Sequence, residues 1–329
     1  NEDGVLDKNS PIGADSGIVV KLKDSNGDVI GTTANPEIGK INADGTFTIR
    51  TNHLDSNYTV SMELPDELKV TKHTGTTDPT SSGTDSDFDR ATLTTQAFHG
   101  FDVSGNANNI SAGIIRLPKL PTDDQFVHVT DEHHKLGIKA ISDNPDKPNP
   151  AITFTAINDP IMDLDTDGVV TPKKTGVVKQ LQMKTSNTLG DTVTGKFNVF
   201  VYSNVIYKNE ESGVSGNAPT DLQKYYPSTS GDTDKVTVMG SGTLRKSGYR
   251  LIGWKDKDGK IYKSGDKFTT GEVEKDTILT AVWEKIPLSK IKSKKPNTGD
   301  MTNQGAYIAI IVSAAALLIA TYIRSKFNE

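Results

Sequence analysis

The segment from residue 306 to residue 323 is the feature that most limits how this chain can fold. Its eighteen residues carry no charge, and as an α-helix they would span roughly 27 Å, about the hydrocarbon core of a bilayer. Tyr307 and Tyr322 stand near its ends, where amphipathic rings favour the membrane interface, and Arg324 and Lys326 follow. The pattern predicts one membrane-spanning helix, with the preceding residues outside the cell and a short basic tail in the cytoplasm. A buried core helix is the alternative, but a core helix of this length rarely lacks a polar face.

The rest of the chain is poor in apolar residues. Hydrophobic residues make up 34% of the 329-residue sequence with that segment included, and aromatic residues 6%. Gly, Thr, Asp, Asn and Ser are frequent and Val and Ile recur at short intervals, which predicts an all-β chain of small modules with thin cores. The length predicts two to four such modules. The net charge of −5, without a stripe of Lys and Arg between aromatic residues, argues against nucleic-acid binding.

A short motif precedes the apolar segment and consists of Lys295, Pro296, Asn297, Thr298 and Gly299. It resembles the LPxTG sorting motif of Gram-positive surface proteins, which is likewise followed by an apolar helix and basic residues. The resemblance implies that a sortase cysteine attacks the carbonyl of Thr298, that Gly299 leaves with the helix, and that Thr298 is joined to peptidoglycan. Pro296 favours an extended backbone that an enzyme groove can bind, and Gly299 has no side chain to obstruct the thiol. Lys295 stands where the family has Leu, which leaves the class of sortase open.

Residues 286–329 are therefore the predicted attachment region, with a basic spacer, the sorting motif at 295–300, the helix at 306–323 and the tail. A single-pass anchor that is never cleaved is the alternative. The sequence has no cysteine, and in an exported chain this favours other staples, such as metal ions or isopeptide bonds. It begins at Asn1 without an apolar leader, so we expect further sequence upstream in the full-length protein.

Residues 205–285 contain short strands separated by turns. The pair Asp258-Gly259 is a hairpin signal, and the segment 277–283 is a strong final strand. Trp254 and Trp283, the two tryptophans of the chain, are predicted to be paired core aromatics of one small sheet, the alternative being exposed rings that stack on a ligand.

This segment resembles the Listeria–Bacteroides repeat, also called the internalin B-repeat family. The matching residues, in order, are Gly248, Tyr249, Gly253, Trp254, Asp256, Asp258, Gly259, Lys260, Ala281 and Trp283. The resemblance implies a β-grasp-like fold that serves as a spacer or adhesion repeat and has no catalytic residue.

Residues 1–118 also alternate strands and turns. The segment 17–23 alternates apolar and polar residues and 24–28 is a turn, a pattern typical of an antiparallel β-sandwich. The module resembles the B-type domain of the serine-aspartate repeat adhesins, an Ig-like, CnaB-type β-sandwich. The similar segments are Asp3–Asp7, Val20–Leu22, Asp24–Gly27, Asp44–Phe47, Tyr58–Val60, Leu64–Pro65, Asp85–Asp89 and Ala112–Ile114. The resemblance implies structural calcium, bound by acidic segments, that stiffens a stalk.

The first candidate calcium site lies at the start of the chain. Asn1, Asp3 and Asp7 fit positions 3, 5 and 9 of a calcium-binding loop, and Val5 offers its carbonyl at position 7. Ser10 stands at position 12, where a bidentate Glu is expected, so the loop is short of negative charge.

The second candidate calcium site is the acidic run at Asp85, Asp87 and Asp89. Alternate side chains of an extended segment point to the same side. Three like charges so placed repel one another unless a cation or solvent screens them. Solvated loop acids are the alternative.

Residues 119–204 match no family that we recognise. The prolines and polar residues of 119–150 indicate a linker or long turns, and runs of apolar residues from Phe126 to Ser203 predict the strands of an unassigned β module. Asp163, Asp165, Asp167 and Gly168 open a calcium-like loop, but Lys174 at position 12 opposes a cation. Acids that cap a turn are therefore favoured.

Two further constellations are weaker. The histidine pair at 133–134 is predicted to lie in a surface loop and not in a metal site, because adjacent strand residues point in opposite directions. An isopeptide cross-link would require a Lys and an Asn to meet beside a buried acid. The candidate members are Lys21, Lys23, Glu63, Asn108 and Asn109.

The sequence thus predicts a cell-surface stalk or adhesion-type display protein, anchored in the cell wall. Its partners would be a sortase, peptidoglycan, the membrane before sorting, and a host or extracellular-matrix ligand. We expect no enzyme, since the sequence lacks a Cys nucleophile, a Gly-x-Ser-x-Gly elbow, a Walker loop and a Rossmann fingerprint. The alternatives are a ligand-binding adhesin head and a membrane-anchored extracellular enzyme whose catalytic part lies upstream.

Overall fold

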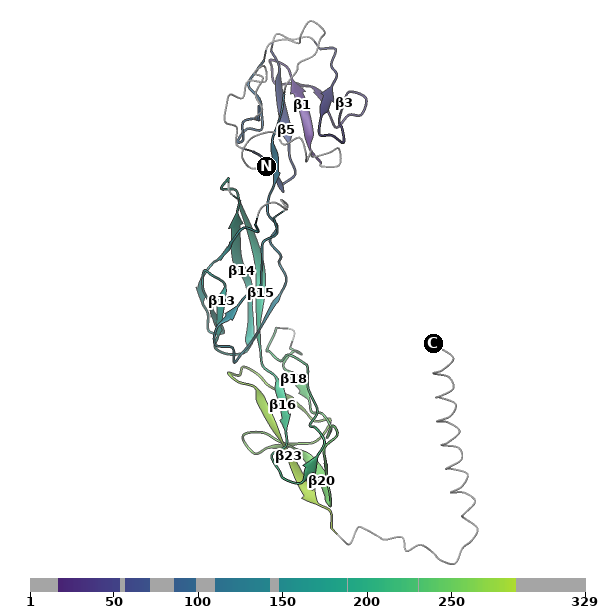
Figure 1. Ribbon diagram of the computed structural model, residues 1–329, viewed down its shortest axis with the longest axis vertical. Coiled ribbons are helices and arrows are strands. Elements are labelled where there is room, and N and C mark those ends of the chain that lie inside the picture. Colours follow the sequence, from purple (N-terminus) through teal and green to yellow (C-terminus); the bar gives the residue numbers. More distant parts are fainter. Residues whose placement is uncertain are drawn as a thin grey trace, which may run out of the picture.

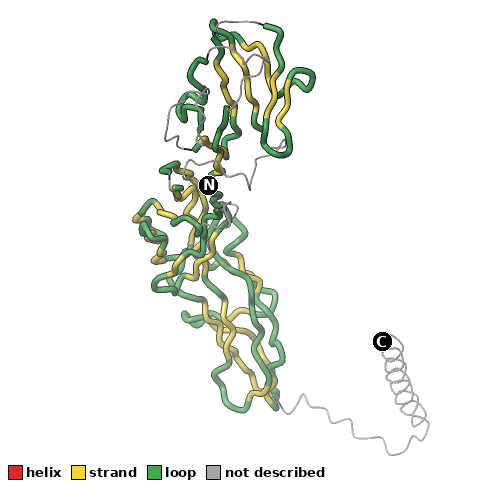
Figure 2. The backbone as a smooth tube through the Cα atoms, turned by 45° about the horizontal axis from the view of Figure 1, so that its top comes forward, coloured by secondary structure: helices red, strands yellow, loops and turns green. Residues whose placement is uncertain are grey.

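The computed structural model describes residues 17–53, 57–71, 86–98, 110–142, 148–187, 189–229 and 231–287. Every regular element in these residues is a β-strand, so the all-β class is confirmed for them (Figure 2). Figure 1 shows three modules that follow one another along the long axis. Each is built around its own hydrophobic core, and we refer to residues 17–117, 118–204 and 205–287 as the first, second and third module.

The first module contains an antiparallel sheet of three strands. Its central strand β1 (Val19–Lys23) lies between β2 (Val29–Thr32) and β5 (Thr59–Glu63). Val20 and Leu22 of β1 are buried, as the alternation of apolar and polar residues predicts. Two antiparallel pairs complete the module: β3 (Gly39–Ile41) with β4 (Phe47–Ile49), and β6 (Leu68–Val70) with β7 (Ile114–Arg116).

The second module consists of two four-stranded sheets, with strand orders β10-β14-β15-β8 and β11-β12-β13-β9. Met162 and Val170 of one sheet and Phe197 and Val199 of the other are buried in a common core, so the sheets form a sandwich. The strands are β8 (Gln125–His128), β9 (His134–Lys135), β10 (Ile152–Phe154), β11 (Ile157–Asn158), β12 (Met162–Leu164), β13 (Val169–Pro172), β14 (Gly176–Ser186) and β15 (Thr192–Tyr202).

The segment 119–150, with its predicted linker or long turns, also holds the first strands of the second module. Strands β8 and β9 lie within this segment, and Val127, Val129 and Leu136 are buried in the core of the second module. The prolines and polar residues around them occupy the connections and not the strands.

The third module has a mixed sheet with the strand order β16-β23-β20-β21. Its strands are β16 (Val205–Lys208), β20 (Tyr249–Lys255), β21 (Ile261–Tyr262) and β23 (Thr277–Lys285). Two short antiparallel pairs lie beside it: β17 (Val214–Ser215) with β19 (Arg245–Lys246), and β18 (Lys235–Thr237) with β22 (Lys267–Thr269).

The two tryptophans belong to the core of the third module, as the sequence predicts. Trp254 is fully buried, and its ring meets that of Tyr207 edge-on at a centroid distance of 4.8 Å. Its indole N–H donates to the carbonyl of Met239 at 3.0 Å. Trp283 is partly buried against the same core and donates to Asn209 at 2.9 Å. The aromatic partner of Trp254 is thus Tyr207 and not the second tryptophan.

One turn occurs in all three modules, beginning at Asp24, Asp165 and Asp256. In each, one side-chain oxygen of the aspartate accepts the N–H groups of the second and fourth following residues at 2.8–2.9 Å. The third following residue is a glycine with φ between 80° and 85°, a region that glycine enters without strain. The turns join β1 to β2, β12 to β13 and β20 to β21.

Within the described residues, none of the chain forms a helix able to cross a bilayer. The apolar segment at 306–323 lies outside these residues, as do the sorting motif and the basic tail.

Candidate functional site at the module junctions

Most of the residues that the sequence marks as sites lie outside the described part of the chain. These are the sorting residues Lys295, Pro296, Asn297, Thr298 and Gly299, and the calcium candidates Asn1, Asp3, Val5, Asp7 and Asp85. Their roles stay predictions.

The two described members of the acidic run are both engaged with the protein. Asp87 is 2% exposed, and its carboxylate accepts the backbone N–H of Ser111 at 2.6 Å. Asp89 accepts the N–H groups of Ala91 and Thr92 at 3.0 and 2.7 Å and so caps a turn. Phe88 between them is fully buried. These contacts satisfy carboxylate oxygens locally, and in the described residues no group of three or more acids and histidines could hold a metal ion.

The acidic loop of the second module is a hairpin turn. Asp165 closes it as described above, and Asp163 on β12 pairs with Lys173 at 2.7 Å. The structure therefore agrees with the interpretation of these residues as turn-capping acids.

The structure describes the histidine pair and the cross-link candidates Lys21, Lys23 and Glu63, whereas Asn108 and Asn109 lie outside the described residues. His134 begins β9 and contacts Asp131 at 3.0 Å, while the ring of His133 is 3.4 Å from the hydroxyl of Thr171. Lys21 forms an ion pair with Glu63, whose side chain is 62% exposed. Glu63 is therefore not the buried acid that an isopeptide cross-link requires.

Several polar contacts between residues far apart in the sequence lie where the second module meets the third. Strand β15 ends at Tyr202 and β16 begins at Val205, so only Ser203 and Asn204 connect the two modules (Figure 1). Ser203 exchanges two backbone hydrogen bonds with Tyr225, at 2.9 and 3.0 Å. The linker is thus held by the third module from its first residue.

Asp276 of the third module fixes the second linker residue. Its carboxylate accepts the backbone N–H of Asn204 at 2.7 Å and lies 2.8 Å from Nε2 of His128, on β8 of the second module. The carbonyl of Asn204 accepts the N–H of Thr277 at 2.9 Å. The His128 and Asp276 side chains are 18% and 17% exposed, so water competes little for these contacts.

Tyr202 completes this side of the junction. Its ring lies 5.2 Å from that of His128. Burial, with further contributions from Asp131 and Asp276, raises the pKa of Tyr202 above its ordinary value. The phenol therefore stays neutral beside the carboxylates.

A second contact holds the opposite side of the junction. Thr175 of the second module is fully buried and pairs with the loop at 271–273 of the third. Its N–H donates to the carbonyl of Val273 at 2.8 Å, and its hydroxyl donates to Gly271 at 3.1 Å and accepts from the N–H of Val273 at 3.0 Å. Lys174 and Glu272 add an exposed ion pair at 2.7 Å.

Aromatic side chains cover the outer face of the same junction. Phe126 stacks on Phe200 at 5.0 Å, and Tyr226 of the third module meets Phe200 at 5.2 Å. The ammonium group of Lys224 lies 4.3 Å above the ring of Phe126 and 4.7 Å from that of Tyr202. These contacts bury apolar surface between modules, which a junction of ion pairs alone would not do.

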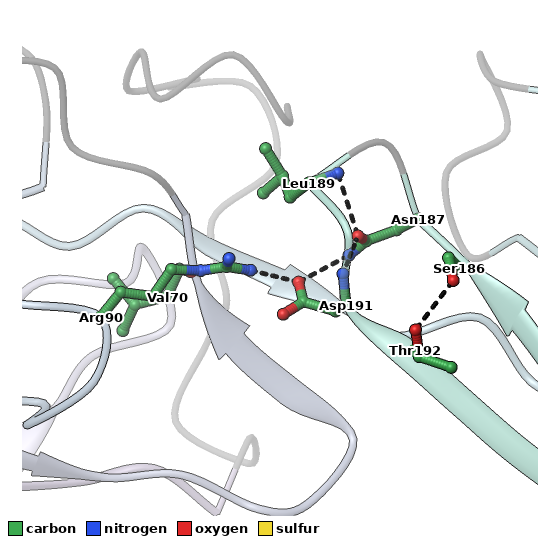
Figure 3. A network of polar contacts seen from close by, with 7 residues as sticks. All are labelled: Val70, Arg90, Ser186, Asn187, Leu189, Asp191 and Thr192. Carbon is green, nitrogen blue, oxygen red and sulfur yellow. Dashed lines mark hydrogen bonds and ion pairs between the residues drawn. The ribbon is translucent and has the colours of Figure 1, made fainter.

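The junction between the first and second modules is different in kind. Arg90 forms an ion pair with Asp191, which lies at the turn between β14 and β15 (Figure 3). Asn187 orients Asp191 through its side-chain amide at 2.9 Å, and Nε of Arg90 donates to the carbonyl of Val70 at 2.8 Å. The connecting segment is bound to the second module through a bridge between Lys119 and Ile141.

A groove of about 640 Å³ lies on the third module between β19 and β20. Its rim carries Lys246 and Arg250, which pair with Glu211 and Glu284. Trp254 forms part of its lining, with serine and glycine residues beside it.

Sequence reasoning missed the junction residues. His128 and Asp276 are 148 residues apart, and neither belongs to a motif. The only sequence signal was the short distance between two strongly apolar runs, 197–202 and 205–207, which leaves no room for a flexible linker.

No family model and no curated protein matches this chain. Among solved structures, the chain is similar to the ectodomain of human desmocollin-1, with 11% sequence identity and a TM-score of 0.19. The match covers 84% of this chain and 57% of that ectodomain, so the chain spans less than two thirds of its length. A TM-score this low carries no argument about fold or function.

Proposed function

We propose that this chain is a cell-wall-anchored stalk or adhesion-type display protein of a Gram-positive cell surface, joined to peptidoglycan by a sortase at Thr298. The observation that carries the proposal is the order of three sequence elements: the motif Lys295–Gly299, the uncharged segment 306–323, and the cations Arg324 and Lys326. A Pro-x-Thr-Gly tetrapeptide alone occurs by chance in many loops, whereas all three elements in this order are a strong signal for sorting.

The β modules support a stalk. In the third module the chain enters on β16 and leaves on β23, and these strands run parallel. The chain therefore enters at one end of the module and leaves at the other, which extends a row of modules instead of folding it back. The continuous connection from β15 to β16 supports the same use.

Within this proposal each segment has a role. Residues 1–118 are an Ig-like, CnaB-type sandwich, and residues 205–285 are a β-grasp-like repeat. The segment 306–323 is a membrane helix that holds the chain until the sortase acts. The outer modules present a binding surface to a host or extracellular-matrix ligand, and no catalytic activity is part of the proposal.

The test is the chemical state of the mature C-terminus. The chain is expressed behind a secretion signal in a Gram-positive host, the wall is digested, and the C-terminal peptide is identified by mass spectrometry. We expect Thr298 to carry a peptidoglycan fragment and Thr298→Ala to retain the tail. Lys295→Leu is the matched variant for the enzyme class, since it restores the residue that the sorting family has there. An intact tail in the unaltered chain and in Lys295→Leu would reduce the proposal to a membrane anchor.

Structural calcium in the first module is a separate part of the proposal. It rests on the resemblance to calcium-binding adhesin domains and on the candidate ligands Asn1, Asp3, Val5, Asp7, Asp85, Asp87 and Asp89. Thermal unfolding of the full chain is measured with calcium and with EDTA. A rise in Tm with calcium is expected, and equal Tm values would remove calcium from the proposal.

A further inference from the structure

We propose that the second and third modules are load-bearing units, in which the strand where the chain enters is clamped to the strand where it leaves. The biological use of this property rests on the proposed function, because a wall-anchored stalk is pulled along its length. The property itself follows from the strand pairing.

The entering and leaving strands of both modules are direct neighbours. In the second module β8 pairs with β15, from Gln125 opposite Val199 to His128 opposite Tyr202. In the third module β16 pairs with β23 in the same way. Both pairs are parallel, while every other strand pair in the described residues of these two modules is antiparallel.

The parallel direction decides how tension acts. Tension pulls the entering strand at its N-terminal end and the leaving strand at its C-terminal end. In a parallel pair these two ends lie at opposite ends of the ladder, so the force runs along the strands. The evenly spaced hydrogen bonds of the pair then carry the load together. In an antiparallel pair that is pulled at one end, the bonds break one after another.

Buried side chains protect both clamps from water. Val127 on β8 and Val199 and Val201 on β15 are 0% exposed. In the third module Leu279 on β23 is 0% exposed and Val205 on β16 is 2% exposed. One face of each pair is therefore closed to water, and the interstrand bonds are stronger there than in a pair exposed on both faces.

The two clamps are connected in series. Force that leaves β15 passes through Ser203 and Asn204 directly into β16. The N–H of Asn204 donates to the carboxylate of Asp276 at 2.7 Å, and its carbonyl accepts the N–H of Thr277 at 2.9 Å. The junction therefore transmits tension without a slack segment.

The first module supplies an internal comparison. Its first described strand, β1, pairs with β2 and β5, and its last strand, β7, pairs with β6. All of these pairs are antiparallel. Among the described strands of this module, no parallel pair connects the first strand to the last. We therefore expect the first module to unfold at a lower force than the other two.

Single-molecule force spectroscopy on the full 329-residue chain, held by its two ends, tests the proposal. Each module is identified by its gain in length, at about 3.6 Å per extended residue. We expect the second and third modules to unfold at no less than about twice the force needed for the first, because a sheared ladder raises the barrier to forced unfolding. Equal forces, or a first module that is the strongest, would overturn the proposal.

A second pulling geometry separates the clamp from ordinary stability. The chain has no cysteine, so Ser247→Cys with Lys285→Cys gives unique attachment points, and both positions are exposed. Tyr249 pairs with Lys285 in the antiparallel ladder of β20 and β23, so force at these points opens that ladder from one end. The third module should then unfold at a clearly lower force than when it is pulled by the chain ends. The same force in both geometries would contradict the clamp. Neither measurement involves a sortase, so failure of transfer at Thr298 and failure of the clamp are distinguishable.

Discussion

The junction between the first and second modules and the junction between the second and third modules are held by different kinds of contact. The first and second modules meet through an ion pair between Arg90 and Asp191. The second and third modules are joined by a linker in which both the N–H and the carbonyl of Asn204 are hydrogen-bonded to the third module. A buried threonine that pairs with the loop at 271–273 and a group of aromatic rings add further contacts. The Arg90–Asp191 contact is a single, partly buried ion pair with side chains 31% and 17% exposed, whereas the other junction combines several buried hydrogen bonds, each of which contributes about 1 kcal/mol and leaves unsatisfied groups when it is lost. The difference indicates a stiff pair formed by the second and third modules and a more independent first module.

The largest effect is expected from Asp276→Ala. The substitution leaves the N–H of Asn204 and the ring of His128 without their carboxylate partner at a nearly buried site. We expect the third module to lose about 2–3 kcal/mol of unfolding free energy. Tryptophan fluorescence during denaturant unfolding measures it, because both tryptophans lie in this module.

The matched control is Asp258→Ala, which removes an exposed carboxylate of the same module, one that contacts the exposed Lys257. Equal losses in the two variants would show that the junction adds nothing to the stability of the third module.

A smaller effect is expected from Thr175→Val. Valine keeps the shape of the side chain but removes the hydroxyl that contacts Gly271 and Val273. We expect a loss of about 1–2 kcal/mol, since the N–H of Val273 loses a buried acceptor. Thr171→Val on the neighbouring strand is the control, because its hydroxyl lies only within 3.4 Å of a histidine ring. A loss no greater than that of the control would contradict the role of Thr175.

The smallest change in stability is expected at the other junction. Asp191→Asn keeps an oxygen for the turn but removes the charge that faces Arg90. Because Arg90 keeps its bond to the carbonyl of Val70 and the pair is only partly buried, we expect about 1 kcal/mol of lost stability. The orientation of the first module should change more than its stability. Small-angle X-ray scattering should report a wider range of overall dimensions, and Arg116→Ala, which breaks a pair inside the first module, should not. An unchanged scattering profile for Asp191→Asn would mean that other contacts hold this junction.

Local signals in the sequence predicted much of the fold. The alternation in 17–23 marks β1, the Asp-Gly pair at 258–259 marks the turn before β21, and the apolar run 277–283 marks β23. Each signal lies within a few residues of the structure that it specifies, because turn chemistry and side-chain alternation act over that distance.

Pairing between distant segments was not predictable in the same way. Strand β8 has one fully buried residue, Val127, between prolines and polar residues, so its segment has the composition of a linker. Its partner β15 is parallel to it, and no short turn connects two parallel strands, so the sequence carries no local signal of their pairing. The contact between His128 and Asp276 was not predictable either, because the two residues are far apart in the sequence and no motif links them.

The recurring turn has a consequence for the chemical ageing of the chain. Asn-Gly and Asp-Gly bonds degrade when the glycine nitrogen attacks the preceding side chain and forms a succinimide, which opens to isoaspartate. Asn26-Gly27, Asp167-Gly168 and Asp258-Gly259 all lie inside this turn, where each glycine N–H is hydrogen-bonded to a backbone carbonyl at 3.0–3.2 Å. The hydrogen bond holds the glycine nitrogen away from the preceding side-chain carbonyl. The turn motif that reverses the chain therefore also slows succinimide formation. If the chain stands at the cell surface as proposed, it gains from both.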